Sequence, residues 1–196
     1  TLDDAKNNVP KFDVFVRLVR SLHPKAEIQG GKKKWEDLRD QLKTCDIIFG
    51  CLDTVLGRRD LENFSRRYLI PYIDIGMGVE TSSRPYAMFG QVQLSSPGHA
   101  CFHCNGFITE DSLKREANNY GQKTKRPQVV WPNGVLASTA VGIAMNMLFN
   151  WSEGRNSTDY LSYNGNDHSI SDHLMKEYRE NSCKHFLLKD AGPINL

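Results

Sequence analysis

Residues 46–53, Asp-Ile-Ile-Phe-Gly-Cys-Leu-Asp, decide the expected fold of this 196-residue chain. Their apolar residues form a continuous run bounded by polar ones, which is typical of a strand buried on both faces of a parallel sheet. A similar run, Pro-Tyr-Ile-Asp-Ile-Gly, occupies residues 71–76, and residues 55–68 between the two runs have helical spacing. Strand, helix and strand in this order predict a right-handed crossover within a parallel sheet.

The same alternation extends toward the N-terminus. Residues 10–22 place apolar side chains at helical spacing, and the following His23-Pro24 pair is a stop signal for a helix. We expect a short strand over residues 25–29 and a second helix over residues 35–43. Helices and strands therefore alternate throughout the first half, which predicts a doubly wound, Rossmann-like sheet.

The pattern changes after residue 86. Residues 87–94 alternate two sets of side chains along the chain, which predicts antiparallel strands. Residues 133–151 are rich in small side chains, and we expect a long helix there that packs closely on a sheet or on another helix. The remaining expected elements are a short helix over 109–117, a mobile loop over 118–128 and a short strand over 160–163.

Charge and hydropathy exclude several classes of partner. The chain has 25 Lys and Arg against 23 Asp and Glu, so it offers no polybasic surface for nucleic acid or an anionic membrane. Mean hydropathy is -0.50, and the most apolar stretch, residues 134–151, is interrupted by Ser138, Thr139 and Asn146, unlike a lipid-facing span. The first residues have no signal-peptide pattern. We expect a cytoplasmic protein with small molecules and proteins as partners.

Cysteine spacing indicates a metal site. Of five cysteines, Cys101 and Cys104 form a CxxC turn, which suits two ligands of tetrahedral Zn²⁺. Cys183 and His185 can supply the other two ligands. A zinc ion with four protein ligands would act structurally, by linking the C-terminal tail to the segment with the CxxC turn. The alternatives are a redox-active CxxC, unmetallated thiols, or His103 as a competing ligand.

Three charged residues could bind a nucleotide. Asp53 follows a predicted parallel strand, where a carboxylate can hold Mg²⁺ against a triphosphate or instead cap the next helix. Arg58 lies within that helix and could contact phosphate or a partner carboxylate, or lie on the surface. Lys11 begins the first predicted helix, where it could bind phosphate or face solvent.

Several of these segments together resemble the adenylyltransferase family that includes ThiF, MoeB, HesA and the ubiquitin-activating enzymes. Their order and spacing match the family over roughly residues 5–150. The tail with Cys183 and His185 is similar to a variant second pair of metal ligands found in bacterial members that are associated with ubiquitin-like pathways. The matching segments are residues 9–11, 22–24, 46–53 with Arg58, 70–76, 98–104 and 133–138.

The resemblance implies an activity and a site. It implies ATP-dependent adenylation, with Mg²⁺, of the C-terminal carboxylate of a ubiquitin-like or sulfur-carrier protein by a homodimer. Lys11 would contact the triphosphate, and Asp53 would bind Mg²⁺ and the nucleotide. Arg58 would lie beside Asp53. These charges would neutralise the negative charge that builds up during attack on the α-phosphorus.

Two departures from the family pattern open alternatives. In the family, a Gly-rich turn and a first βαβ unit should precede the residue that matches Lys11, so we expect these parts in a longer protein. Alternatively, a second chain could supply them. A third possibility is a non-catalytic scaffold subunit of a heterodimeric activating enzyme. No cysteine lies between Cys104 and Cys183, which disfavours a thioester-forming role.

The predicted fold class is α/β. We expect a Rossmann-like parallel sheet with flanking helices that continues into antiparallel strands and a zinc-stapled C-terminal region. Residues 1–150 would form the latter part of an adenylation domain, and residues 151–196 would supply a strand and the tail that carries two metal ligands.

Overall fold

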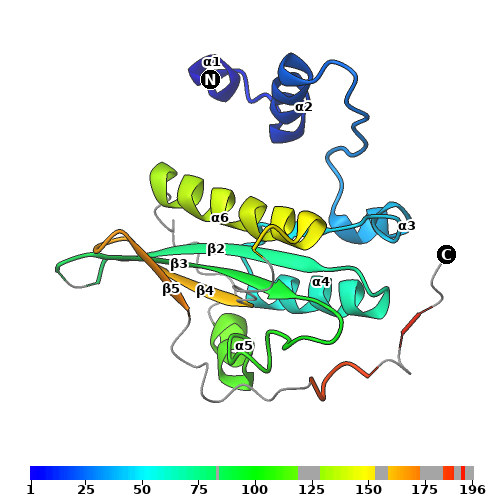
Figure 1. The fold of residues 1–196 in the computed structure, drawn as a ribbon. Helices are drawn as coiled ribbons and strands as arrows, with labels where there is room; N and C mark the ends of the chain where they lie inside the picture. The colour runs from blue at the N-terminus through cyan, green and yellow to red at the C-terminus, as the bar shows by residue number, and fades with distance from the viewer. Residues whose placement is uncertain (83, 119–128, 153–158, 173–182, 188–190, 193–196) are drawn as a thin grey trace. The chain divides into compact units, whose positions relative to one another are not determined.

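The computed structural model describes the chain except for residues 83, 119–128, 153–158, 173–182, 188–190 and 193–196 (Figure 1). The chain forms two compact units, Thr1–Thr44 and Cys45–Leu196. The predicted division at residue 150 remains a prediction, and the expected loop over 118–128 lies almost wholly outside the described residues.

The first unit is helical. The predicted helix over 10–22 is α2, Lys11–Leu22, and the one over 35–43 is a 3₁₀ turn, η1, continued by α3. The strand predicted over 25–29 is wrong, because a strand needs a neighbour to accept its backbone hydrogen bonds and the described residues of this unit contain only helices. The elements of this unit are α1 Leu2–Lys6, α2 Lys11–Leu22, η1 Trp35–Leu38 and α3 Arg39–Leu42.

The second unit is built on a five-stranded sheet of order β1-β2-β3-β4-β5. The β1–β2 pair is parallel, and every later pair is antiparallel, so the sheet changes from a Rossmann-like part to an antiparallel part as expected. The strands are β1 Ile48–Gly50, β2 Tyr72–Glu80, β3 Ala87–Ser95, β4 Tyr160–Asn164 and β5 Ser169–Asp172.

Helices cover both faces of this sheet (Figure 1). Helix α6, Val130–Phe149, lies on one face, and α4, Val55–Arg67, which connects β1 to β2, lies on the other with α5, Glu110–Asn118. The core on the α6 side is the buried cluster of Ile73, Val92, Leu94, Leu136, Ala140, Ala144 and Tyr163. The fold is therefore α/β, with one parallel crossover and an antiparallel extension.

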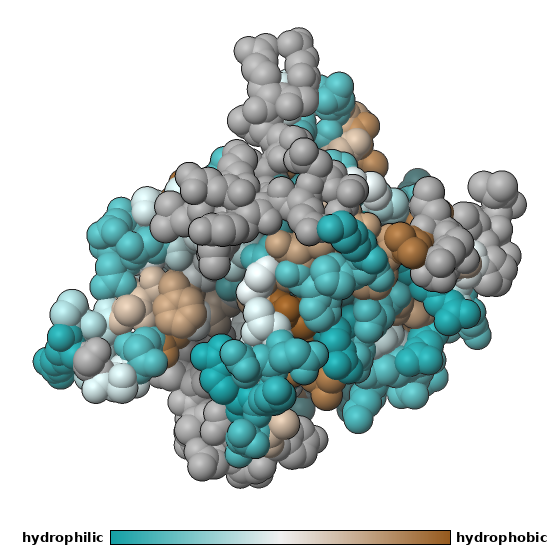
Figure 2. Space-filling view, turned by 90° about the horizontal axis from the view of Figure 1, so that it is seen from below, coloured by the Kyte–Doolittle hydropathy of each residue, from teal (hydrophilic) through white to brown (hydrophobic). Residues whose placement is uncertain are grey.

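Local departures from the predicted elements have simple causes. Strand β1 is buried on one face only, because Phe49 is 46% exposed. Helix α6 begins at Val130, three residues before the expected start, and β5 was not predicted since its sequence is polar and all four residues are exposed. Seen from the α5 side, the described surface is mostly hydrophilic with small apolar patches (Figure 2).

Helix α6 is unusually apolar. By length and composition it could cross a membrane, a test that the core helices of globular proteins also pass. Leu136, Ala140 and Ala144 are buried against the sheet, whereas only 22% of the most apolar window of α6 is buried inside the structure.

Candidate functional site

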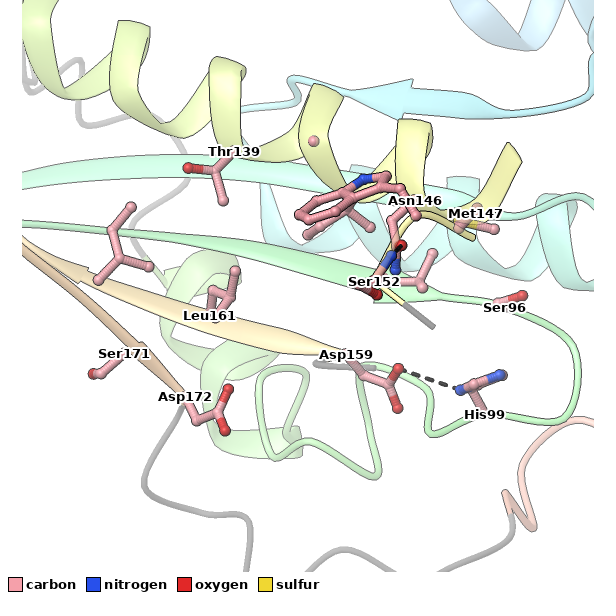
Figure 3. A pocket seen from close by; sticks show the side chains of 15 residues that line it. Ser96, His99, Thr139, Asn146, Met147, Ser152, Asp159, Leu161, Ser171 and Asp172 are labelled. Atoms are coloured by element: carbon pink, nitrogen blue, oxygen red, sulfur yellow. Dashed lines mark hydrogen bonds and ion pairs between the residues drawn. The ribbon is translucent and has the colours of Figure 1, made fainter. Parts of the chain in front are cut away.

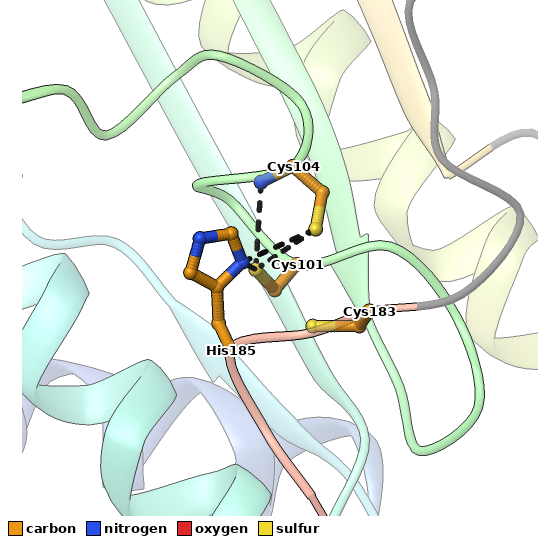
Figure 4. Close-up of side chains that lie close together, drawn as sticks. All are labelled: Cys101, Cys104, Cys183 and His185. Atoms are coloured by element: carbon orange, nitrogen blue, oxygen red, sulfur yellow. Dashed lines mark hydrogen bonds between the residues drawn. The ribbon is translucent and has the colours of Figure 1, made fainter.

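Four predicted metal ligands lie together near the end of β3. The Sγ atoms of Cys101, Cys104 and Cys183 and a ring nitrogen of His185 all lie within 4.8 Å of one another, and Figure 4 shows the four side chains pointing toward a common centre. The two CxxC sulfurs are 3.5 Å apart, and each is 3.4 Å from His185 Nδ1. The sequence alone therefore identified a set of donors that the fold brings together.

These separations suit zinc. Tetrahedral zinc with Zn–S near 2.3 Å and Zn–N near 2.1 Å requires sulfurs about 3.8 Å apart and sulfur to nitrogen about 3.6 Å apart. The distances among Cys101, Cys104 and His185 are close to these values, and Cys183 Sγ lies within 4.8 Å of the other three atoms. A disulfide would instead bring two sulfurs to about 2.05 Å. Three thiols and one imidazole are the donors of a closed structural site, with no position for a reacting water.

Helix α4 fixes the loop that carries the CxxC turn. The buried Glu62 carboxylate accepts hydrogen bonds from Ser95 Oγ at 2.5 Å and from the Phe102 amide at 2.8 Å. The Arg66 guanidinium donates to Ser95 Oγ and to the carbonyls of Ser96, His99 and Ala100. Cys101 is consequently buried and held at the base of the loop.

The thiols differ in their electrostatic surroundings. Burial raises the pKa of Cys101 well above its usual value. Burial also acts to raise the pKa of Cys183, but hydrogen bonds from the backbone of His185 and Phe186 and from the other two thiols outweigh it and lower that pKa. His103 is not in the cluster; its ring stacks on His185 with centroids 5.2 Å apart, and burial lowers its pKa.

Asp53 lies beyond the carboxyl end of β1, exposed and directly before α4. The N-cap of α4 is Thr54, whose hydroxyl accepts a hydrogen bond from Gly57 N at 3.1 Å. The alternative interpretation of Asp53 as the capping residue is therefore wrong. Its carboxylate is not used to cap the helix that follows.

Arg58 is not a surface arginine. Its side chain is 13% exposed, its Nε lies 3.3 Å from Asp74 Oδ1, and its guanidinium lies 5.5 Å from the centre of the Phe107 ring. The charge is therefore already matched inside the protein, at the level of the first turn of α4. A contact between Arg58 and a nucleotide stays a prediction.

Lys11 begins α2 in the Thr1–Thr44 unit, whereas Asp53 and Arg58 belong to the other unit. The grouping of these three residues around one nucleotide accordingly also stays a prediction.

The structure adds Asp74 to the charged residues near Arg58. Its side chain is fully buried in β2, and Oδ1 accepts a hydrogen bond from the Tyr72 hydroxyl at 2.9 Å. Burial raises the pKa of Asp74 to about 6, although Arg58, Tyr72 and Gln91 act to lower it. A carboxylate inside an apolar strand is a sequence signal that could have identified it.

The sequence also did not predict that Glu116 contacts the N-terminus of α4. Its two carboxylate oxygens accept hydrogen bonds from the backbone amides of Val55 and Leu56, both at 2.8 Å, so α5 provides a second cap for α4. Contacts across 60 residues of chain leave no local pattern. This carboxylate lies at the N-terminus of α4, which follows β1, where the sequence predicts nucleotide binding.

Comparisons with known proteins agree with this architecture. The ThiF family profile matches residues 1–185. Similar solved structures include E. coli MccB with ATP (TM-score 0.59, 16% identity, 84% of this chain and 47% of MccB). They also include E. coli MccB with MccA-N7isoASN (0.59, 16%, 84% and 49%) and E. coli MccB alone (0.57, 17%, 84% and 46%).

At these identities the likeness to MccB shows a shared fold, and the chain spans about half the length of those proteins. No curated protein matches. The family profile, in contrast, covers nearly the whole sequence from its first residue. The chain therefore belongs to the ThiF family.

Proposed function

We propose that this protein takes part in ATP-dependent adenylation of the C-terminal carboxylate of a ubiquitin-like or sulfur-carrier protein. Membership of the ThiF family supports the reaction class, and one MccB structure of the same fold was solved with ATP. The observation that carries the proposal is Asp53, an exposed carboxylate at the carboxyl end of a parallel strand, where open α/β sheets bind ligands.

Each residue has a distinct role in this proposal. Asp53 would hold Mg²⁺, which offsets charge on the triphosphate. Lys11 and Arg58 would supply positive charge near the α-phosphorus, while Asp74 fixes the orientation of Arg58 through the 3.3 Å contact. An oxygen of the carrier's C-terminal carboxylate attacks the α-phosphorus, the acyl-adenylate forms, and pyrophosphate leaves. Positioning and charge neutralisation would provide most of the rate acceleration.

Zinc would serve a structural role. Cys101, Cys104, Cys183 and His185 would join the loop after β3 to the C-terminal tail, 80 residues away in sequence. A homodimer is the assembly that we propose, and exposed apolar side chains on α6, including Val141 and Leu148, offer it a surface.

A scaffold subunit without catalytic activity is the second candidate. Two observations favour it: Asp74 already neutralises Arg58, and Glu116 already occupies the first two amides of α4. In a scaffold subunit, the carboxylates of Asp74 and Glu116 would occupy the groups that bind the phosphates of a nucleotide in a catalytic subunit.

Nucleotide binding separates the two candidates. Calorimetric titration of the intact protein with ATP and Mg²⁺ should show binding that is weakened in Asp53→Ala, because the ligand loses its metal-holding carboxylate. Asp111→Ala, which removes an exposed carboxylate in the first turn of α5, should bind like wild type. A wild-type protein that binds no ATP would favour the scaffold.

A further inference from the structure

Phe107 joins the loop after β3 to the candidate catalytic arginine. The centre of its ring lies 5.5 Å from the guanidinium carbon of Arg58. An aromatic ring within about 6 Å attracts a guanidinium, because the face of the ring carries negative partial charge. The position of this ring therefore bears directly on where the Arg58 charge lies.

The loop holds Phe107 in one orientation. The amides of Phe107 and Ile108 both donate to the carbonyl of Phe102, at 3.0 and 3.1 Å. Phe102 is fully buried, and its own amide donates to Glu62 of α4. The Phe107 ring meets the rings of Phe102 and Tyr160 edge to face, with centroids 6.0 and 6.5 Å apart. Backbone hydrogen bonds and two neighbouring rings thus fix the ring that Arg58 contacts.

Three groups surround the Arg58 guanidinium. Asp74 Oδ1 lies 3.3 Å from Nε, and the Phe107 ring faces Cζ. The third group is the backbone of β2 at Gly76, where an added Cβ atom would lie 2.9 Å from Arg58 Nη2, so glycine gives the guanidinium room against the strand. A guanidinium has five N–H donors, and Nε carries one of them. The contact of Asp74 with Nε therefore does not use all the donors that could bind phosphate.

Strand β4 separates this contact from the other face of the sheet. Tyr160 packs against Phe107, whereas Leu161, the next residue, points to the opposite face because side chains alternate along a strand. There Leu161 lines a cavity of about 570 Å³ between α6 and the sheet (Figure 3). Phe107 and Leu161 are both partly buried. A substitution of Leu161 therefore removes apolar packing on the face away from Arg58.

We propose that Phe107 is a positioning residue for adenylation, whose ring holds the Arg58 guanidinium in the orientation that contacts the phosphates of ATP. This inference rests on the proposed function and assigns Phe107 no contact with the nucleotide. An arginine side chain that is already ordered loses less conformational entropy when it binds a phosphate. The loop after β3 thereby contributes to the nucleotide site through one ring.

Calorimetric titration of the intact protein with ATP and Mg²⁺ tests the inference. Phe107→Leu keeps an apolar side chain but removes the ring, and we expect ATP to bind about fivefold or more weakly. Phe107→Tyr keeps the ring and should restore binding to within about twofold of wild type. Leu161→Ala is the control, and it should bind ATP like wild type. Thermal melting checks that each variant is folded.

A double-mutant cycle shows whether Phe107 acts through Arg58. Arg58→Lys keeps a positive charge beside Asp74 but lacks the planar guanidinium that stacks on a ring. Phe107→Leu should therefore change ATP binding by less than about twofold when Arg58→Lys is already present. A general loss of packing would instead weaken ATP binding equally in both backgrounds.

The possible failures can be told apart. Three results would overturn this inference alone: ATP binding by Phe107→Leu that equals wild type, no recovery in Phe107→Tyr, or equal weakening in the two backgrounds of the cycle. A wild-type protein that binds no ATP would overturn the proposed function together with it.

Discussion

Arg58 of α4 and Asp74 of β2 form a buried ion pair, with Nε and Oδ1 3.3 Å apart, that ties the crossover helix to the strand it precedes. Asp74 is fully buried and also accepts a hydrogen bond from Tyr72. Asp74 pairs with Gly50, the last residue of β1, so the ion pair lies at the end of β1 that Asp53 follows. Packing of this face and placement of a candidate catalytic arginine therefore depend on the same carboxylate.

Removing that carboxylate charge should be costly. Asp74→Asn leaves the Arg58 guanidinium without its counter-charge, and breaking a buried pair from one side costs about 3 kcal/mol or more. Urea unfolding measures the loss. Asp40→Asn is the control, because Asp40 forms an exposed pair with Lys43 and exposed ion pairs add little to stability. If both variants lose the same free energy of unfolding, the buried Arg58–Asp74 pair stabilises the fold no more than an exposed pair does.

Glu62 should make stability depend on pH. Burial raises the pKa of Glu62 from 4.5 to about 7, despite opposing hydrogen bonds from Ser95 and Phe102. Because the folded state holds the proton more tightly, the stabilising contribution of this group is complete below pH 4.5 and is lost as pH rises through about 7.

The variant Glu62→Gln keeps a neutral side chain at every pH. Its stability relative to wild type should therefore rise between pH 4.5 and pH 8, by on the order of 3 kcal/mol. Urea unfolding of both proteins in the same buffers tests this. A relative stability that stays constant across the range would show that the Glu62 carboxyl does not titrate with a raised pKa.

The metal site predicts a stoichiometry. Elemental analysis of protein purified without chelator should find one zinc per chain, and Cys183→Ser should reduce it because three ligands hold zinc far less tightly than four. Cys45→Ser is the control, since Cys45 lies outside the cluster. Zinc-free wild-type protein, or equal zinc in the two variants, would remove the assignment.

Glu116 should stabilise α4 from outside the helix. Its carboxylate accepts from the amides of Val55 and Leu56 and faces the positive end of the helix dipole. Glu116→Ala should lower the free energy of unfolding by about 1–2 kcal/mol, as loss of a cap does. Glu110→Ala, an exposed change in the first turn of α5, should cost less. If both substitutions lower the free energy of unfolding equally, the two hydrogen bonds that Glu116 accepts from α4 do not stabilise the protein.

The sequence predicted those features that local patterns determine. Helical spacing identified α2 and α4, and alternation identified β3, because burial of one face sets these periods within a single segment. The many small side chains of residues 133–151 indicated α6. Residues 25–29 have the composition of a strand, but a strand also requires a partner, which local sequence does not specify. Strand β5 shows the converse, since it pairs with β4 despite a polar, exposed sequence.

The candidate site shows the same division. Cysteine and histidine spacing was sufficient to identify four donors that lie within 4.8 Å of one another. The Arg58–Asp74 pair and the Glu116 cap were not predicted, because they join side chains of different elements and only the packing of α4 on β2 and α5 brings them together. Sequence identifies chemical groups more readily than it identifies which of them meet.

The most direct test of the central claim is ATP–pyrophosphate exchange by the intact protein, assayed with ubiquitin-like and sulfur-carrier proteins of the source organism. Adenylation predicts exchange that requires one of these carriers and falls by about 100-fold or more in Asp53→Ala, but not in Asp111→Ala. Carrier-dependent exchange that is undiminished in Asp53→Ala would contradict the assignment of this site.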